Sequence, residues 1–414
     1  MKYRMKQIYY KIIIYVCFMI IIHIYITIFY DIKECNITKK YSQYDPNTKH
    51  ILLWTPSKRA PYKFMGLGQK VFIERNCSYT NCFVAKRDIF SDYTKFHAII
   101  FIMREVIYYQ SYKLPKFRQP YQKYVFSSIE SSHNYPVCSN ILDRYFNWTW
   151  SFRLDSDCRL EYIAIRDVNN TVIGPNKDMH WMKVEHMQPV SHEFQNSLKT
   201  KSKAAAWFVS NCFTKSHRER YITKLKYELA EYNHTVDTYG NCANHSCRFG
   251  NTMYSNCNLS CPKEEERCME MIRSDYYFYL SFENSFNEDY VTEKLLHALK
   301  NNAIPIVYGK ANYTRFMPDG IYINAMELRP KELAKKMDEL IRDHKKYANY
   351  FKWQNHYSYH SRNESAETDD FCAFCKLLND EEKFKKKSVI GNFRKWWDSP
   401  DYCRKDNINA VALE

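Results

Sequence analysis

The sequence of 414 residues predicts an α/β protein with several parallel strands, preceded by a single membrane-spanning helix. Three observations support this fold class. Residues 275–309 have the pattern of strand, loop, helix and strand, which is half of an α/β sheet. Further apolar runs each open into a polar turn, as buried strands do. Residues 12–30 are almost wholly apolar or aromatic, and that length is sufficient to span a bilayer.

The N-terminal segment is predicted to be an uncleaved signal-anchor. Basic residues precede the apolar run, and no acidic residue occurs before it or within it. A cleaved signal peptide would end in small residues, yet neither Ala nor Gly occurs before Ala60. The basic flank favours a cytosolic N-terminus. We therefore expect a cytosolic tail at 1–11, the span at 12–30, a short polar stem at 31–48 and a lumenal body.

Sequons and cysteines agree with passage through the secretory route. All Asn-X-Ser/Thr sequons follow the apolar run. They lie at Asn36, Asn76, Asn147, Asn169, Asn233, Asn244, Asn258, Asn312 and Asn363. All cysteines except Cys17 also follow it, and their even number suits disulfides in an oxidising compartment.

The composition describes a globular, basic body. The chain is 45% hydrophobic with only 8 Gly, and its formal net charge is +15. Such an excess can indicate nucleic-acid binding, but these charges are spread along the chain rather than clustered. A membrane-anchored lumenal chain has no access to nucleic acid. Binding of a small anionic ligand is the better interpretation, with general solubility as the alternative for most of the lysines.

Four apolar runs are predicted strands of two successive α/β halves. HILLWTP, KFHAIIFIMRE and QKYVFSSIESSHNY begin at residues 50, 95 and 122, and they belong to a first half at 49–195. KAAAWFVSNC opens a second half at 196–378. Residues 379–414 are expected to form a C-terminal tail.

The segment 275–309 combines a strand with a chemically equipped helix. Phe278, Leu280 and Phe282 alternate with more polar residues, which predicts one strand face more deeply buried than the other. Asp289 is expected to be the helix N-cap, and Pro305 marks the end of the helical stretch before a β-branched strand.

One face of this helix has polar and charged side chains near the carboxyl end of the preceding predicted strand. Tyr290, Glu293, Lys294 and His297 share it, and a helix N-terminus in this position favours a phosphate. The alternative is an ordinary solvated face, and for His297 a packed or solvated histidine is the favoured interpretation.

FENSFNEDYVTEK at residues 282–294, followed by AIPIVYG, resembles the donor-binding signature of α1,3-fucosyltransferases, glycosyltransferase family 10, in an invertebrate-like form. VFSSIESS, FNWTWSFRLDSD, AWFVSNC, NYTRFMP and FCAFC occur in the order of that family. The resemblance covers about residues 50 to 378. It implies two Rossmann-like domains facing a cleft, the GT-B arrangement. It also implies transfer of L-fucose from GDP-β-L-fucose to GlcNAc with inversion, by a single-pass type II protein of the Golgi membrane.

The resemblance assigns roles to individual residues. Glu130 matches the proposed general base, although Ser132 stands where the family usually has Pro, and Phe152 stands where many members have Tyr. The remaining matches are donor-binding residues. They are Ser210, Asn211, Arg218, Tyr279, Asn284, Tyr290, Glu293 and Lys294.

No metal or cofactor is expected. Asp155 and Asp157 could hold a divalent cation, but two carboxylates leave most oxygen ligands unaccounted for, and the family requires no metal. The CxxC at Cys372 and Cys375 has no second pair at zinc-finger spacing. In the family such late cysteines are bridged to early ones, for which Cys77 and Cys82 are the candidates. The connectivity of the other late cysteines, 212 to 268, stays open.

Two other functions remain as alternatives. A transferase of another nucleotide sugar would conflict with the order of the motifs. A membrane-tethered glycan-binding protein on a decayed transferase fold would be expected to lose Glu130, Arg218 or Lys294, and the sequence retains all three. The acceptor is also open between the core GlcNAc of N-glycans and a GlcNAc of an outer antenna.

Overall fold

The computed structural model describes residues 14–25, 47–55, 58–87, 92–108, 114–138, 140–243, 261–397 and 403, with the side chains of 261–265 excepted. Residues 14–25 are helical and fall within the predicted span, whose other residues lie outside the described ones. The predicted cytosolic tail and nearly all of the predicted stem also lie outside them. Among the described residues, no helix is both long and apolar enough to cross a membrane.

The first sheet has six parallel strands in the order β2-β1-β3-β4-β5-β6. They are β1 (Lys49–Leu53), β2 (Cys82–Lys86), β3 (Ala98–Ile102), β4 (Lys123–Ser128), β5 (Trp148–Ser151) and β6 (Cys158–Arg159). The strands predicted in the runs that begin at 50, 95 and 122 are confirmed as β1, β3 and β4.

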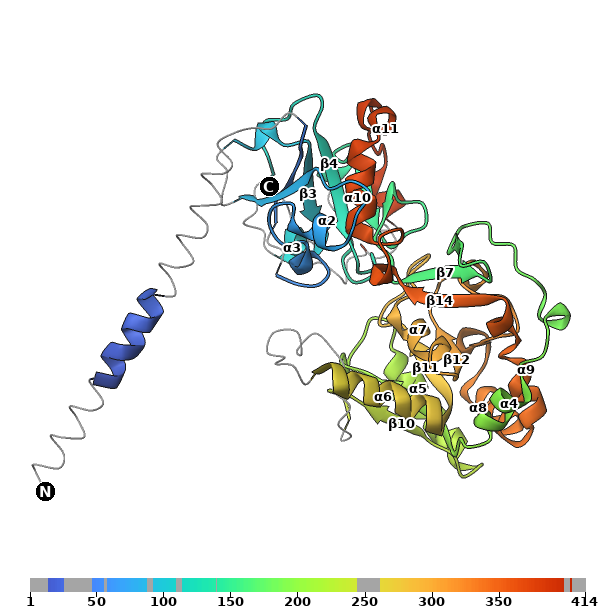
Figure 1. The fold of residues 1–414 in the computed structure, drawn as a ribbon. Helices are drawn as coiled ribbons and strands as arrows, with labels where there is room; N and C mark the ends of the chain where they lie inside the picture. The colour runs from blue at the N-terminus through green and yellow to red at the C-terminus, as the bar shows by residue number, and fades with distance from the viewer. Residues whose placement is uncertain are drawn as a thin grey trace, which may run out of the picture.

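The second sheet has five parallel strands in the order β10-β9-β11-β12-β13. They are β9 (Lys203–Phe208), β10 (Val236–Tyr239), β11 (Tyr276–Phe282), β12 (Ile304–Tyr308) and β13 (Ile323–Asn324). β9 confirms the strand predicted at the opening of the second half. A small antiparallel sheet lies between the two large ones (Figure 1). Its strands are β7 (Ile163–Asp167), β8 (Val172–Gly174) and β14 (Tyr357–Ser361).

Helices cover both large sheets. The helices that pack beside the first sheet are α2 (Lys70–Glu74), α3 (Met103–Tyr108), α10 (Asp370–Asn379), α11 (Glu381–Lys385) and α12 (Phe393–Trp396). Those of the second half are α4 (His192–Leu198), α5 (Arg218–Ala230), α6 (Cys261–Asp275), α7 (Glu293–Leu299), α8 (Pro330–Arg342) and α9 (His344–Asn349).

The C-terminal segment returns to the first sheet and covers both of its faces. On one face, Phe374 of α10 stacks on Trp150 with ring centroids 4.6 Å apart. On the other, Trp397 lies 4.6 Å from Phe126, and all four side chains are fully buried. Figure 1 shows α10 and α11, drawn in red, beside β4. Residues 379–397, which we predicted as part of a tail, therefore contribute to the core of the first half.

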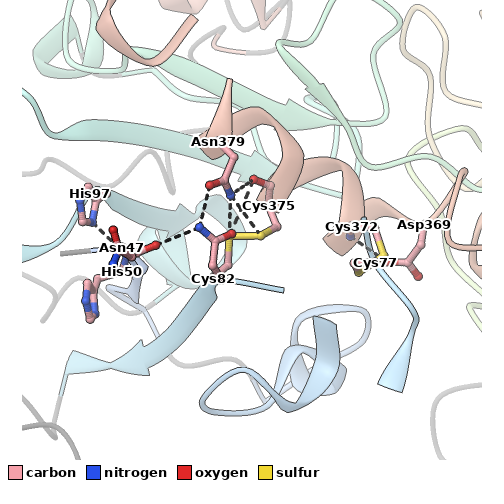
Figure 2. Close-up of a disulfide and its surroundings, with 10 residues drawn as sticks. Asn47, His50, Cys77, Cys82, His97, Asp369, Cys372, Cys375 and Asn379 are labelled. Carbon is pink, nitrogen blue, oxygen red and sulfur yellow. Dashed lines mark hydrogen bonds between the residues drawn. A yellow bond between two sulfur atoms is a disulfide. The ribbon is translucent and has the colours of Figure 1, made fainter. Parts of the chain in front are cut away.

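Two disulfides join this returning helix to the start of the body. Cys77 is bonded to Cys372 and Cys82 to Cys375 (Figure 2), which confirms the pairing of early with late cysteines that the family resemblance implied. They close loops of 295 and 293 residues, so each would remove much conformational entropy from the unfolded chain. Cys77, Asp369 and Cys372 lie close enough together to suggest a metal site. Because the two cysteines form a disulfide, they offer no thiolate to a metal.

Two details of the segment 275–309 differ from the prediction. All seven residues of β11 are buried, so the predicted difference between its faces is wrong; helices cover both faces of this sheet. The N-cap of α7 is Thr292, and Asp289 is not a cap. Asp289 has a positive φ of 61°, and its carboxylate instead accepts from the Leu154 backbone N–H and pairs with Arg315.

Candidate active site

The loops that follow β4 and β11 bring the two halves into direct contact. The hydroxyls of Ser131 and Ser285 lie 2.6 Å apart, and the amide of Asn287 donates to the Ser132 hydroxyl. All four side chains are buried. Ser132, which departs from the proline typical of the resembling family, therefore contributes a hydrogen bond between the halves. Sequence reasoning did not single out Ser131, Ser285 or Asn287, because no local pattern shows which distant loop a serine will meet.

Glu130 lies at this junction, two residues beyond β4. Its Oε2 accepts from the Tyr290 hydroxyl at 3.0 Å and from the Asn134 amide at 3.2 Å. Burial and the Glu130 carboxylate raise the pKa of Tyr290 well above its ordinary value, so the phenol is protonated and donates. Phe152 packs against the Tyr290 ring with centroids 4.9 Å apart. A carboxylate of the first half is thus oriented by a residue that precedes α7.

Lys294 is held between two carboxylates at the start of α7. Its Nζ lies 3.2 Å from Glu283 Oε2 and 3.1 Å from Glu293 Oε1, and it donates to Thr292 Oγ1 at 2.7 Å. Burial alone would lower the pKa of Lys294, but the two carboxylates raise it, so the ammonium remains charged. Glu283 also accepts from the Thr292 backbone N–H at 2.9 Å. It thereby fixes the first turn of the helix, a role that the sequence analysis missed although the residue belongs to the FENS motif.

Arg218 is the first residue of α5, and its side chain is almost fully buried. Its guanidinium donates to the carbonyls of Phe282 and, at 3.4 Å, Asn211, and it lies 5.5 Å from the centre of the Trp207 ring. Within the described part of the chain, its Nε has no hydrogen-bond partner. These contacts are to carbonyls rather than to carboxylates. Burial lowers the pKa of Arg218, and the nearby Glu283 and Glu293 carboxylates oppose that shift, so the cation has counter-charge within the site and, among the described residues, an unused donor at Nε.

The other predicted donor residues lie around these cations. Ser210 and Asn211 follow β9 and are exposed. The Asn284 amide oxygen accepts from Asn134 at 3.4 Å. Tyr279 is fully buried in β11, and its hydroxyl lies 3.1 Å from His297 Nδ1. Burial lowers the pKa of His297 to about 4, so its imidazole is neutral at pH 7 and packed, as favoured from the sequence.

A histidine with basic neighbours, His133, lies beside the junction. His133 stacks on Phe286, with ring centroids 6.3 Å apart. Burial, together with the nearby Lys215, His217 and Lys310, lowers the pKa of His133 to about 4. The imidazole of His133 is therefore neutral at pH 7, and Lys215 and Lys310 lie close enough to affect it.

Asp155 and Asp157 have separate protein partners. Asp155 accepts from the Arg153 guanidinium at 2.9 and 3.0 Å and from Lys177 at 3.2 Å. Asp157 accepts from the backbone N–H and the hydroxyl of Thr149, at 2.8 and 2.9 Å. Although burial opposes it, the hydrogen bond and charge of Arg153 lower the pKa of Asp155. Both carboxylates thus have structural roles.

Comparison with known proteins identifies relatives along most of the chain. The family profile "Glycosyltransferase family 10 (fucosyltransferase) C-term" matches residues 198–396, and "Fucosyltransferase, N-terminal" matches residues 46–163. The chain is 31% identical to Alpha-(1,3)-fucosyltransferase C of Drosophila melanogaster, over 88% of this chain and 81% of the relative. It is 33% identical to 4-galactosyl-N-acetylglucosaminide 3-alpha-L-fucosyltransferase FUT6 of Pan troglodytes, over 83% of this chain and 82% of the relative.

A solved structure described as alpha1,3-fucosyltransferase with GDP-fucose also matches the chain. The TM-score is 0.46 at 14% sequence identity, over 82% of this chain and 93% of that chain.

Proposed function

The chain belongs to glycosyltransferase family 10, the fucosyltransferases, and from this premise we propose that it transfers L-fucose from GDP-β-L-fucose in α1,3 linkage to GlcNAc of glycoprotein N-glycans. Both relatives described above are named as fucosyltransferases of this linkage, which supports the reaction. The two parallel sheets, with junction loops between them, suit a GT-B arrangement. The acceptor is a core or an antennal GlcNAc.

The observation that carries the proposal is the contact between Glu130 and Tyr290, at 3.0 Å across the two halves. A transferase that inverts configuration needs a general base on the acceptor side of the donor sugar, and a carboxylate can serve as that base. Glu130 belongs to the first half, whereas the cations Arg218 and Lys294 belong to the second. A sugar between them would have a base on one side and the departing diphosphate on the other.

The reaction then takes one step. Glu130 accepts the proton of the GlcNAc 3-hydroxyl while that oxygen attacks C1 of fucose. The bond from C1 to the β-phosphate oxygen breaks, and GDP leaves with the electron pair. Arg218 and Lys294 stabilise the negative charge that accumulates on the diphosphate, without a divalent cation. Because attack and departure occur on opposite faces, the β-linked fucose of the donor becomes α-linked in the product.

The test is an assay of the full chain with GDP-fucose and a panel of defined N-glycans and lactosamine. We expect α1,3-fucosylated product on at least one acceptor, and the active acceptor separates core from antennal specificity. Parallel reactions with other nucleotide sugars test the alternative that the protein transfers a different sugar. Binding of glycans without transfer from any donor would instead favour the decayed transferase.

We also propose that the body lies in the Golgi lumen behind a single type II anchor at residues 12–30. The acid-free basic N-terminus, the apolar run and the sequons beyond it support this topology. Protease added to intact microsomes is expected to spare the body, and endoglycosidase is expected to reduce its mass. Digestion of a body that carries no glycan would contradict the proposal.

A further inference from the structure

We propose that Phe213 stacks on the guanine base of the donor nucleotide and so contributes to nucleotide affinity. The inference rests on the proposed function, since it assumes a nucleoside diphosphate at Arg218. Phe213 is 88% exposed, an unusual state for a phenyl ring in a loop whose neighbours are held in place. An exposed aromatic ring can stack on the planar base of a nucleotide, because every base has a π-face.

The loop that carries Phe213 is fixed at several points. Cys212 is bonded to Cys242, which joins the loop after β9 to the loop after β10. Thr214 donates to Glu219 at 2.9 Å, and the Ser216 hydroxyl donates to the Glu283 carbonyl at 2.7 Å. The exposed ring therefore belongs to an ordered loop between two predicted donor-binding residues, Asn211 and Arg218.

The same two loops approach each other closely at Gly240. This glycine has a φ of +103°, and a Cβ there would lie 2.5 Å from the carbonyl oxygen of Val209. Only glycine therefore permits this approach. The disulfide and the glycine together hold the loops after β9 and β10 close to each other at the carboxyl ends of these strands.

The direction of the donor follows from the order of the strands. Glu130 contacts Tyr290, which lies in the loop after β11, so the fucose belongs on that side. Arg218 bonds both the carbonyl of Phe282, at the end of β11, and that of Asn211, beyond β9. Since the sheet order is β10-β9-β11, continuing from the sugar through the diphosphate leads to the loops after β9 and β10. The nucleoside would therefore lie beside Phe213.

The experiment measures the affinity of the full chain for GDP and for inorganic pyrophosphate by calorimetry. Phe213→Ala is expected to raise the Kd for GDP about 5- to 100-fold, as loss of one base–aromatic stack does. The Kd for pyrophosphate should not change, because pyrophosphate has no base. Phe213→Trp should restore GDP binding, whereas Tyr227→Ala, which removes a ring that is 75% exposed on α5, should match the parent.

Three other results are possible, and each contradicts a different part of the proposal. Equal GDP affinity in the parent and Phe213→Ala excludes the stack while leaving the proposed function intact. Equal weakening of GDP and pyrophosphate means that the residue acts on the loop rather than on the base. A parent chain that neither binds GDP nor transfers fucose contradicts the proposed function itself.

Discussion

Glu130→Gln is expected to lower kcat by about 10²–10⁴, the usual effect of removing a general base. Glutamine retains an oxygen that can accept from Tyr290 and Asn134, so the junction between the halves is preserved. It removes only the basicity needed to accept the proton of the attacking hydroxyl. Affinity for GDP-fucose should barely change, because the predicted donor contacts belong to the second half.

Single-turnover transfer and calorimetric binding of GDP measure these two effects separately. Glu74→Gln is the matched control, since Glu74 is a carboxylate of the same half that pairs with Lys70 on the surface of α2. It should transfer fucose at the parent rate. A near-parent rate for Glu130→Gln, or a defect confined to donor binding, would remove Glu130 from the role of base.

Lys294→Ala is expected to weaken GDP-fucose binding and to slow transfer by about 10²–10³, the typical cost of losing one charge-stabilising donor. The physical reason is that Lys294 is a charged ammonium at the start of α7, where a diphosphate would meet both it and the helix N-terminus. KM and kcat for GDP-fucose, measured with and without chelator, check the prediction.

The substitution also leaves the carboxylate of Glu283 buried without its cation. The double variant Glu283→Gln with Lys294→Ala removes this unpaired charge, so a slow enzyme that still melts cooperatively reports on the donor and not on folding. Lys300→Ala, at the other end of the same helix and paired with Glu364, is the matched control. Loss of activity in chelator, combined with full activity of Lys294→Ala, would mean that a cation neutralises the diphosphate instead.

Features with a local cause could be predicted from the sequence. β3 and β12 are short apolar, β-branched runs next to turn residues, and burial on both faces requires that composition. Motifs such as FENS and SNC could be placed at strand ends for the same reason. The prediction of Asp289 as an N-cap failed because its carboxylate is engaged by Leu154 and Arg315, and the helix begins after Thr292, whose side chain makes no capping hydrogen bond.

Contacts between residues far apart in the chain were predicted only where the family resemblance implied them. The family resemblance implied that Cys372 and Cys375 return to Cys77 and Cys82, and the bridges agree. Nothing in the sequence indicated that Cys138 is bonded to Cys403, at a separation of 265 residues. Similarly, the aromatic residues after 390 have no periodic pattern, and their burial against Phe126 follows only from the shape of the completed sheet.

By itself, the sequence determined the position of Glu130 at a strand end, the cationic helix start at Lys294 and the strands β1, β3, β4, β9, β11 and β12, because periodicity and turn chemistry act over a few residues. Tertiary structure alone decided that Glu130 meets Tyr290, 160 positions away, and that the Arg218 guanidinium turns toward the carbonyl of Phe282. Such contacts depend on how the two sheets pack against each other. That packing is set by the sum of many weak interactions between residues distant in the chain, which no local pattern encodes.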